Sequence, residues 1–333
     1  MVLMRVGIVG VSGYGGRELL RLCLQHPSFE VVYVAGDSSA GQTLAQRFPT
    51  LAGHPAGRLE IEPFVPDRIA GIDLLFASLP TGKSREPLAR VPQGIKIVDV
   101  GGDHRLVEGW TYGLTELAGQ RAKIAGANRV ANPGCYPAAA LLALAPLVGA
   151  GLVDPEGIVV DAKSGVTGTG RGGASDFGYA ETNEDLFGYG LEGHPHVPEL
   201  VSALSELAGR RASVAFTPHL IPMTRGILAT CYARPRATLI TARVYEAARS
   251  WYDGEAFVRV VPVERGRGPH TKWANASNFA FLSYAVNEET GLAVALAAID
   301  NLGKGASGQA VQNANLMTGQ DETAGLTALP VWI

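Results

Sequence analysis

GIVGVSGYGGREL (Gly7–Leu19) concentrates glycines between a short apolar run and a segment with helical spacing. The apolar residues 5–10 predict a buried strand, and the leucines within 17–25 predict an amphipathic helix. Glycines in such a strand-to-helix turn let the backbone approach a pyrophosphate, whose charge the helix N-terminus stabilises. The spacing departs from the strict G-x-G-x-x-G pattern, so an ordinary tight turn stays open as the alternative. The candidate cofactor-binding residues of this turn are Gly10, Ser12, Gly13, Tyr14, Gly15 and Gly16.

The chain that follows alternates between apolar strands and helical segments up to about residue 134. Strands are predicted at 30–35, 73–79 and 95–100, and a helix is predicted at 83–90. This alternation, with nearly continuous apolar strands, is typical of a parallel sheet that helices cover on both faces. We therefore predict an α/β protein whose N-terminal part is a Rossmann-type, doubly wound dinucleotide-binding domain.

From residue 135 onward the pattern changes to one long helix followed by hairpin-like strands. This change predicts a second α+β domain with a mainly antiparallel sheet. The predicted domains are 1–134 plus 301–333, for dinucleotide binding, and 135–300, for catalysis and oligomerisation. The predicted strands are 158–162, 212–220, 227–233, 257–261, 280–286 and 292–297, and the predicted helices are 138–148, 198–207, 240–252 and 301–317.

The composition is that of an ordinary globular protein. Its 333 residues are 47% hydrophobic and 18% charged, with a formal net charge of −3 and no basic block. Neither nucleic acid nor a membrane is therefore expected as a partner. The chain has 3 cysteines and no CxxC motif, which argues against a disulfide framework and against a zinc site. No signal-peptide pattern precedes residue 5, so we expect a cytoplasmic protein. Because no histidines, cysteines and carboxylates have the spacing of metal ligands, we also expect no bound metal.

The end of the second predicted strand should decide which dinucleotide binds. The segment GDSSAGQ (Gly36–Gln42) places Asp37 and Ser38 there, and no arginine comes before Arg47. An acidic residue at this point usually accepts a hydrogen bond from the ribose 2′-hydroxyl of NAD, whereas an arginine suits the 2′-phosphate of NADP. Because Ser38 can also bind a phosphate, these residues lean towards NAD without excluding NADP.

NPGCYPAAA (Asn132–Ala140) holds Cys135 among residues that break regular structure, just ahead of an apolar helical run. A thiol at a helix N-terminus feels the positive end of the helix dipole, which favours the reactive thiolate. Cys23 and Cys231 instead lie inside apolar segments, the usual setting of structural cysteines. We predict that Cys135 is a nucleophile, one turn ahead of a helix that begins at 138.

A nucleophilic thiol needs an acid or base as its partner. GHPHVPEL (Gly193–Leu200) offers His194 and His196 just before a predicted helix whose first turn contains Glu199. His219 is a further candidate, located in a predicted strand. The residues themselves leave open which of these histidines is the acid/base.

Cationic side chains near glycines or at strand ends predict that the substrate is an anion. The loop KSGVTGTGRGG (Lys163–Gly173) offers backbone N–H donors beside cations and hydroxyls, although a flexible surface loop is an equal alternative. Arginine side chains near two other strands have the fork geometry that matches carboxylate and phosphate. The set predicts a substrate with a carboxylate and a phosphate, or one that reacts with free phosphate. The candidate residues are Arg105, Lys163, Ser164, Gly165, Arg171 and Arg225.

Together these motifs resemble those of the N-acetyl-γ-glutamyl-phosphate reductases, a family of arginine biosynthesis. The resemblance runs from residue 7 to residue 318 and implies a catalytic domain like that of aspartate-semialdehyde dehydrogenase, in a homodimer or homotetramer. It further implies that Cys135 is the nucleophile, that His196 is the acid/base and that Asn301 lies near the cofactor. Asn132, residues 163–171 and Arg225 would belong to the substrate site. The motifs that carry it are GVSGYGGREL, NPGCYP, DAKSGVTGTGR, GHPHVPEL, FTPHLIPMTRGIL and DNLGKGASGQAVQNANLM.

The resemblance implies a reversible, NADPH-dependent reduction of N-acetyl-γ-glutamyl phosphate to the semialdehyde and phosphate, through a cysteine thioester. Asp37 departs from the serine/arginine-type segment that the family often has, so NADH stays open, and Pro195 replaces a common arginine. The alternatives are a carrier-linked aminoadipyl-phosphate reductase of lysine biosynthesis, an aspartate-semialdehyde dehydrogenase and a non-catalytic dinucleotide sensor. Tyr136 and Pro137, which follow the cysteine, favour the arginine-type enzyme over the lysine-type enzyme.

Overall fold

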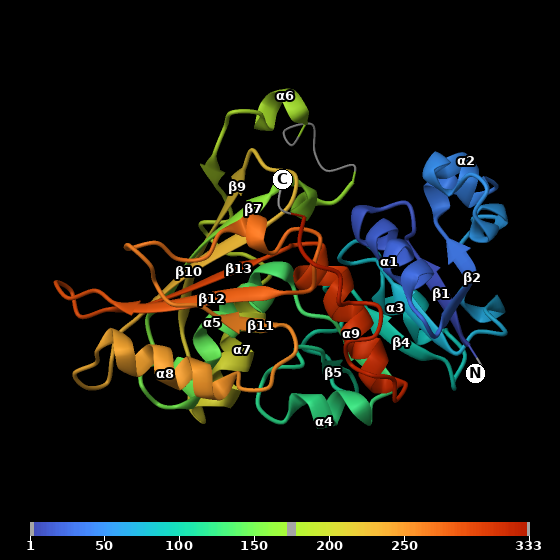
Figure 1. Ribbon diagram of the computed structural model, residues 1–333. Helices are drawn as coiled ribbons and strands as arrows, with labels where there is room; N and C mark the ends of the chain where they lie inside the picture. The colour runs from blue at the N-terminus through green and yellow to red at the C-terminus, as the bar shows by residue number, and fades with distance from the viewer. Residues whose placement is uncertain (1–2, 172–177, 332–333) are drawn as a thin grey trace. The chain divides into compact units, whose positions relative to one another are not determined.

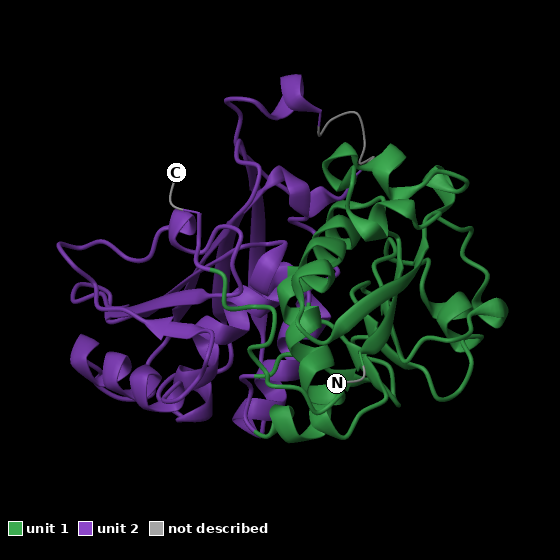
Figure 2. Ribbon diagram, turned by 45° about the vertical axis from the view of Figure 1, so that its right-hand side comes forward, with its two compact units in different colours: residues 1–115, 119–133, 306–328 green, residues 116–118, 134–305, 329–333 purple. Residues whose placement is uncertain are grey.

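The computed structural model describes residues 3–171 and 178–331 of the chain. Its contacts group the chain into two compact units, which Figure 2 colours separately. The first unit comprises 1–115, 119–133 and 306–328, and the second comprises 116–118, 134–305 and 329–333. Residues 301–305, which the sequence assigns to the dinucleotide-binding domain, thus group with the second unit.

The first unit contains the parallel sheet that the sequence predicts (Figure 1). Among the described residues it has six strands in the order β2-β1-β3-β4-β6-β5, and its pairings are parallel. The chain passes from β1 to β2 on one side and then to β3 on the other, which makes the end of β1 a topological switch point. Open α/β sheets bind their ligands at such points. The strands are β1 (Met4–Val9), β2 (Phe29–Ala35), β3 (Leu74–Ala77), β4 (Lys96–Asp99), β5 (Thr111–Tyr112) and β6 (Arg129–Ala131).

The helices of the first unit include α1 (Tyr14–Gln25), which packs on β1 and β2, and α9 (Gly308–Met317), which packs on α1 and β4. The sequence predicted one helix over 301–317, and its first part is wrong. A π-helix, η8 (Gly303–Ser307), precedes α9, because the backbone N–H of Gly305 bonds to the carbonyl of Asp300, five residues earlier. The other α-helices of this unit are α2 (Leu44–Arg47), α3 (Arg85–Ala89) and α4 (Gln120–Ala125).

The second unit contains a mixed, mostly antiparallel sheet, which confirms the predicted fold class. In the part of the chain that the structure describes, its strand order is β11-β12-β13-β10-β7-β9-β8. The pairings are antiparallel, except that β11 is parallel to β12 and β7 is parallel to β9. The strands are β7 (Ile158–Gly165), β8 (Phe187–Gly188), β9 (Val214–Ile221), β10 (Ile227–Ala233), β11 (Val258–Val260), β12 (Ala280–Val286) and β13 (Ala293–Ile299).

Helix α5 (Cys135–Gly149) is the central helix of the second unit. Its residues 136–148 are buried, so the helix is apolar on every side and belongs to the core. It packs on β10, β12 and β13 and is flanked by α7 (Val197–Ala208) and α8 (Thr241–Trp251). One face of the sheet is thus covered by helices. Along each strand, side chains that point to this covered face alternate with side chains that point to the opposite face.

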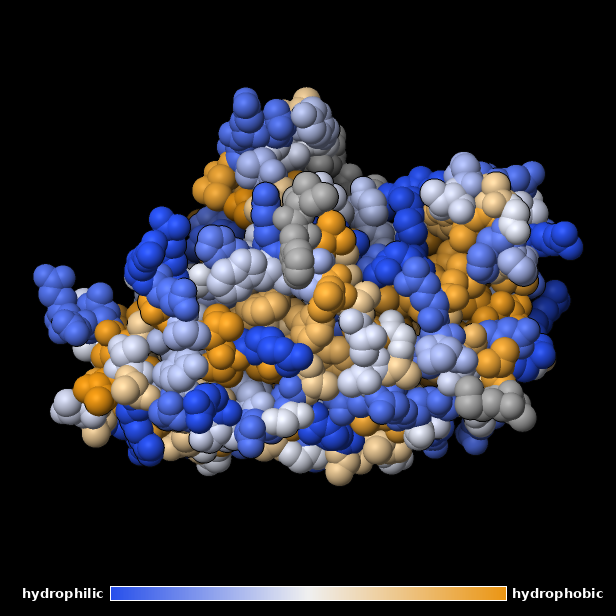
Figure 3. All heavy atoms as spheres, viewed as in Figure 1, coloured by the Kyte–Doolittle hydropathy of each residue, from blue (hydrophilic) through white to orange (hydrophobic). Residues whose placement is uncertain are grey.

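A segment with exposed apolar side chains extends from the second unit around α6 (Tyr179–Thr182). Tyr179 is 81% exposed and Leu191 is 72% exposed. Figure 3 shows hydrophobic surface beneath the hydrophilic tip of this segment. Within residues 3–171 and 178–331, every helix is too short or too polar to cross a membrane.

Candidate active site

Cys135 is the first residue of α5, not a residue one turn ahead of the helix as the sequence predicted. Gly134 is the N-cap in an extended conformation, and its carbonyl accepts the first helical hydrogen bond from Ala138 N, at 2.8 Å. Pro137 fits within the first turn, because the N–H groups there have no helical acceptor. The partly exposed Cys135 thiol therefore lies at the positive end of a fifteen-residue helix.

Helix α7 begins against the same end of α5. His196 is its N-cap, and Glu199 lies in its first turn. The Glu199 carboxylate, 2% exposed, accepts a hydrogen bond from the backbone N–H of Gly134 at 2.9 Å. This bond joins the two helix N-termini, so the structure brings Cys135, His196 and Glu199 together as neighbours.

Aromatic packing fixes both histidine rings beside the first turn of α5. The Tyr136 ring contacts His194 and His196 edge-on, with ring centroids 6.2 Å and 6.1 Å apart. The two imidazoles are 4.7 Å apart and also pack edge to face. Phe216 of β9 lies 5.3 Å from the Tyr136 ring and closes the cluster from the covered face of the sheet.

A backbone hydrogen bond and burial set the state of the His194 ring. The Nδ1 atom of His194 accepts a hydrogen bond from the backbone N–H of His196 at 3.1 Å, so this nitrogen carries no proton. Burial also lowers the pKa of His194, which keeps its imidazole neutral near pH 7. His194 is therefore held as a neutral ring, and the choice of His196 as the acid/base stays a prediction.

Two tyrosine hydroxyls lie beside this cluster. The Tyr136 hydroxyl donates to the carbonyl of His219 at 2.9 Å and accepts a longer contact, at 3.4 Å, from the Tyr189 hydroxyl. Burial, reinforced by Tyr189, raises the pKa of Tyr136, while a hydrogen bond with Ser164 opposes this shift. Ser164 thus lies toward the start of α5. Tyr189 could not be found from the sequence, because its partner is 53 positions away.

Gly165 ends β7 against the turn that carries Arg225. A Cβ atom on Gly165 would lie 2.9 Å from the backbone nitrogen of Arg225 and 2.7 Å from the carbonyl of Met223. Only a glycine permits this approach, and it brings the end of β7 next to the start of β10. Ser164, Gly165 and Arg225 are therefore grouped as the sequence predicted.

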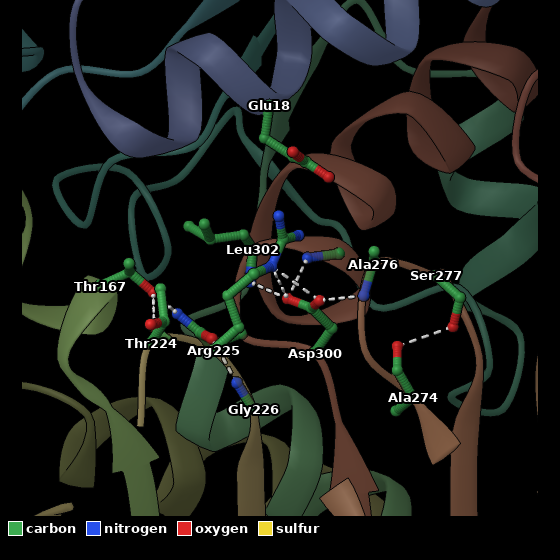
Figure 4. Close-up of polar contacts among 12 residues, drawn as sticks. Glu18, Thr167, Thr224, Arg225, Gly226, Ala274, Ala276, Ser277, Asp300 and Leu302 are labelled. Atoms are coloured by element: carbon green, nitrogen blue, oxygen red, sulfur yellow. Dashed lines mark hydrogen bonds and ion pairs between the residues drawn. The ribbon is translucent and has the colours of Figure 1, made fainter. Parts of the chain in front are cut away.

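Arg225 is held by a carboxylate that the sequence analysis missed, as Figure 4 shows. The Nε atom of Arg225 donates to Asp300 at 2.9 Å and 3.2 Å, and the Asp300 side chain is fully buried. The next residue, Asn301, accepts from Gly226 N at 2.8 Å and donates to the hydroxyl of Thr167 at 2.9 Å. Asn301 was predicted to lie near a cofactor, but here its amide ties β10 to the turn after β7.

Lys163 and His219 lie on the opposite face of the sheet from α5, so the structure does not group them with Cys135. Lys163 belongs to β7 rather than to the predicted loop, because β7 pairs with β9 and β10 beyond residue 162. It pairs with His219 in register and forms an ion pair with Asp161 at 2.7 Å. His219 Nδ1 lies 3.2 Å from the same carboxylate. Arg171, exposed at the end of the described loop, is followed by 172–173, which lie outside the described residues.

The glycine turn of the first unit has the shape of a phosphate-binding loop. A Cβ on Gly10 would lie 2.1 Å from the carbonyl of Ser78, and one on Gly16 would lie 2.1 Å from the carbonyl of Gly10. Gly10 also has a φ of 79°, which favours glycine. Gly13 is the N-cap of α1, and among the described residues no side chain caps this helix. The uncapped N-terminus fits a pyrophosphate, as in dinucleotide-binding folds.

The turn after β2 presents the residues predicted to select the dinucleotide. Ser12 and Ser39 are buried and joined by a 2.8 Å hydrogen bond, which ties this turn to the glycine loop. Asp37 and Ser38 are exposed at the start of a short 3₁₀ helix, Asp37–Ser39. Both side chains are therefore accessible, and their contact with a ribose substituent stays a prediction.

The last two predicted substrate residues, Arg105 and Asn132, lie in the first unit. The Nε atom of Arg105 donates to the carbonyl of Asn132 at 3.0 Å. The Asn132 side chain is fully buried, donates to Ala306 O at 3.0 Å and accepts from Asn313 at 3.0 Å. Asn132 thus supports Arg105, the end of η8 and α9, and its amide is occupied by protein groups.

Exposure and burial predict that the three thiols differ in reactivity. Cys135 is partly exposed, whereas Cys23 and Cys231 are 0% and 1% exposed, and burial raises the pKa of both. We expect iodoacetamide to alkylate Cys135 at least about a hundred times faster than the other two, because only a thiolate reacts. Peptide mass spectrometry over a time course measures each rate. Equal labelling of the three thiols would contradict this site.

Both units match known families. Residues 5–127 match the family described as semialdehyde dehydrogenase, NAD binding domain, and residues 135–301 match semialdehyde dehydrogenase, dimerisation domain. An aspartate semialdehyde dehydrogenase II of Vibrio cholerae, complexed with ASA, superposes with a TM-score of 0.75 at 15% identity, covering 96% of this chain and 99% of that one. An aspartate semialdehyde dehydrogenase with NADP from Candida albicans gives 0.74 at 14%, covering 95% and 99%. At such identities the likeness shows the fold alone.

Sequence relatives are more specific. A Bradyrhizobium sp. (strain BTAi1 / ATCC BAA-1182) protein named N-acetyl-gamma-glutamyl-phosphate reductase is 58% identical over 330 residues, covering 99% of each chain. A protein of the same name from Moorella thermoacetica is 42% identical over 348 residues, covering 97% of this chain and 98% of its own. These identities extend across both units and confirm the resemblance noted in the sequence. The chain belongs to the N-acetyl-gamma-glutamyl-phosphate reductase family of oxidoreductases.

Proposed function

We propose that this protein catalyses the reversible reduction of N-acetyl-γ-glutamyl phosphate to N-acetylglutamate semialdehyde and phosphate, in arginine biosynthesis. The observation that carries the proposal is the meeting of two helix N-termini, which places Cys135 of α5 beside the N-cap histidine of α7. The relatives that match over 99% of the chain bear the name of this activity. The cysteine sequence NPGCYP supports this substrate over the aminoadipyl analogue.

In the first step the Cys135 thiolate attacks the acyl carbon and expels phosphate, leaving a thioester on Sγ. His196 accepts the thiol proton and later returns a proton to the oxyanion that forms as the thioester is reduced. The resulting thiohemiacetal then collapses: its C–S bond breaks, the hydroxyl proton passes to Sγ through His196, and the semialdehyde leaves. The neutral His194 packs against the ring of Tyr136, the residue that follows the nucleophile. When bound, the nicotinamide cofactor supplies the hydride, while the chain supplies position and electrostatic field.

The substrate anions would be held by a group of residues near the end of β7. Ser164 and Gly165 end this strand beside Arg225, whose guanidinium fork suits a carboxylate or phosphate. Arg105 of the first unit and Arg171 of the glycine-rich loop are the further cations that we assign to substrate binding. We assign no role in substrate binding to Lys163 and His219, because their side chains lie on the opposite face of the sheet.

We propose NADPH as the hydride donor, with NADH as the competing cofactor. The glycine turn and the uncapped α1 support a dinucleotide in either case. The exposed Ser38 hydroxyl suits a 2′-phosphate, whereas the neighbouring Asp37 carboxylate would repel one. The first unit thus carries one residue for each cofactor, which makes a moderate preference the expected result.

We also propose that the protein is a homodimer or homotetramer that acts in the cytoplasm. The match of 135–301 to a dimerisation domain and the exposed Tyr179 and Leu191 support association through the second unit. A reducing compartment is expected because the nucleophilic thiol must stay reduced.

The proposed function is tested with the full chain in the oxidative direction. N-acetylglutamate, aspartate and aminoadipate semialdehydes are each assayed with phosphate or arsenate and with NADP⁺ or NAD⁺, following nicotinamide absorbance. We expect kcat/KM for the N-acetylated substrate to exceed the others at least about a hundredfold, because polar groups in the site would be left unpaired by the wrong substrate. A preference for either other semialdehyde would replace the proposed substrate, and an absence of all turnover would favour the sensor.

A further inference from the structure

Asp300 makes more contacts than its place at the end of β13 requires. The strand ends at Ile299, and the fully buried Asp300 carboxylate follows it. Besides Arg225, its oxygens accept from the backbone N–H groups of Leu302 at 2.8 Å and Gly303 at 3.1 Å, and from Ala276. Figure 4 shows Arg225, Ala276 and Leu302 around the Asp300 carboxylate, one from each of three segments of the chain.

The first of these segments carries Arg225. Both oxygens of Asp300 lie on the Nε side of the guanidinium, at 2.9 Å and 3.2 Å. This contact fixes the direction of the guanidinium plane, because Nε is part of the delocalised planar group and the Nε–Cζ bond does not rotate freely. The backbone of the same turn is held separately, by Asn301 at Gly226 N. At this turn, Asp300 therefore orients the Arg225 side chain, whereas Asn301 holds the backbone.

The second segment is η8, which packs directly on the nucleophile. The backbone carbonyl of Asp300 accepts from Gly305 N at 2.9 Å, while its side chain holds the two amides at the start of the π-helix. A Cβ atom on Gly305 would lie 3.0 Å from the Cβ of Cys135. Short π-helices occur mostly at functional sites. The path of η8 thus sets the packing on one side of the Cys135 side chain.

The third segment is the turn at 274–277. Ala276 has a φ of 60°, an unusual conformation for a residue with a side chain, and its N–H points to Asp300. A Cβ on Gly303 would lie 2.1 Å from the carbonyl of Ser277, so η8 and this turn are in backbone contact. Strained residues of this kind persist where the surroundings fix them, and they cluster at functional sites.

We propose that Asp300 is a positioning residue, which aims the Arg225 guanidinium at the substrate anion and sets the packing of η8 against Cys135. The inference rests on the proposed function in so far as Arg225 binds the substrate. One buried carboxylate then couples the residue that holds the substrate to the residue that attacks it. Asp300 touches neither substrate nor cofactor in this role.

The test measures Asp300→Asn, which keeps the side-chain shape but turns one acceptor oxygen into a donor. We expect the KM for the semialdehyde to rise about tenfold or more, because a hydrogen bond to a charged group is lost. The KM for the dinucleotide should change less than about twofold, since that site lies in the first unit. The alkylation rate of Cys135 by iodoacetamide should rise at least about twofold, because a released η8 uncovers the side chain.

A double-mutant cycle separates positioning from general destabilisation. If Asp300 acts through Arg225, Asp300→Asn should have almost no further effect on KM in an Arg225→Met background. The proposal is overturned if the two substitutions raise KM by factors that multiply in the double variant. It is also overturned if Asp300→Asn leaves KM unchanged. If Asp300→Asn does not fold, Arg225→Lys tests the same contact, because lysine lacks the Nε atom that Asp300 holds. Retention of the wild-type KM in Arg225→Lys would also overturn it.

The matched control is Asp154→Asn. Asp154 also accepts from an arginine, Arg210 at 2.7 Å, and from a backbone N–H, that of Glu156 at 3.0 Å, but it is partly exposed. The KM of Asp154→Asn for the semialdehyde should stay within about twofold of the wild-type value. The cycle is run with whichever semialdehyde the wild-type protein accepts, so a different substrate overturns the proposed function alone. If no semialdehyde is accepted, the alkylation rate decides, and an unchanged rate in Asp300→Asn rejects the proposal.

Discussion

Cys135→Ser should lose turnover in both directions by at least about a thousandfold. A serine hydroxyl at the N-terminus of α5 keeps the position of the nucleophile but stays protonated where a thiol ionises, so the acyl carbon is not attacked. The partly exposed thiol lies at the first residue of a buried helix, which gives it access to a substrate. The measurement is phosphate-dependent nicotinamide reduction by the semialdehyde, with stopped-time assays for residual activity.

Two controls separate the chemistry of Cys135 from its role in packing. Cys231→Ala changes a buried thiol of β10 and should lower stability without changing kcat per folded molecule. The thermal unfolding midpoint of Cys135→Ser should stay close to that of the wild type, because the thiol is partly exposed. Turnover retained within about tenfold in Cys135→Ser would remove Cys135 from the mechanism.

His196→Asn should lower kcat by about 10²–10⁴-fold, the usual contribution of a general acid/base. The N-cap position of His196 places its ring beside the first turn of α5, and asparagine removes no cap because the His196 side chain makes no capping hydrogen bond. The loss should therefore come from proton transfer and not from unfolding. A pH series of kcat/KM, with added imidazole to restore a base, measures it: imidazole should recover part of the activity.

The matched variant is His194→Asn. His194 is held neutral, because its Nδ1 accepts from the His196 backbone N–H and burial lowers its pKa. Its replacement should therefore disturb packing without removing a group that transfers protons in the reaction. We expect a loss of less than about tenfold and an unchanged shape of the pH profile. A greater loss in His194→Asn than in His196→Asn, together with a flattened pH profile, would exchange the roles of the two residues.

Much of the fold can be read from the sequence because periodicity and strand composition are local. The predicted strands 227–233 and 280–286 coincide with β10 and β12. The predicted start of α5, at 138, is too late because the apolar run that indicates the helix begins only there. Gly134 is in fact the N-cap, and Pro137 lies within the first turn. A glycine followed by a proline can stand before a helix or inside its first turn, and the sequence alone does not distinguish the two.

The site was less predictable where its parts meet across the chain. The pairing of Arg225 with Asp300 spans 75 positions, and nothing near either residue specifies it. The sequence signal was present but weak: an acidic residue ends the apolar strand just before NLGKG. Lys163 was misassigned for a different reason. Its loop is a strand up to Gly165, and the period of two then turns its side chain away from α5.

The burial of α5 has a consequence for inherited variation in this protein. Cys135, the nucleophile that we propose, is the first residue of a helix whose following residues, 136–148, are all buried, so this end of the helix cannot fold apart from the core. Substitutions along these residues lower the amount of folded enzyme in the cell, which chaperones and proteases then reduce further. Such variants would behave like a reduced expression level: less enzyme would be present, and the folded molecules would have a normal KM. Defects in catalysis itself should map instead to the few residues around the N-termini of α5 and α7.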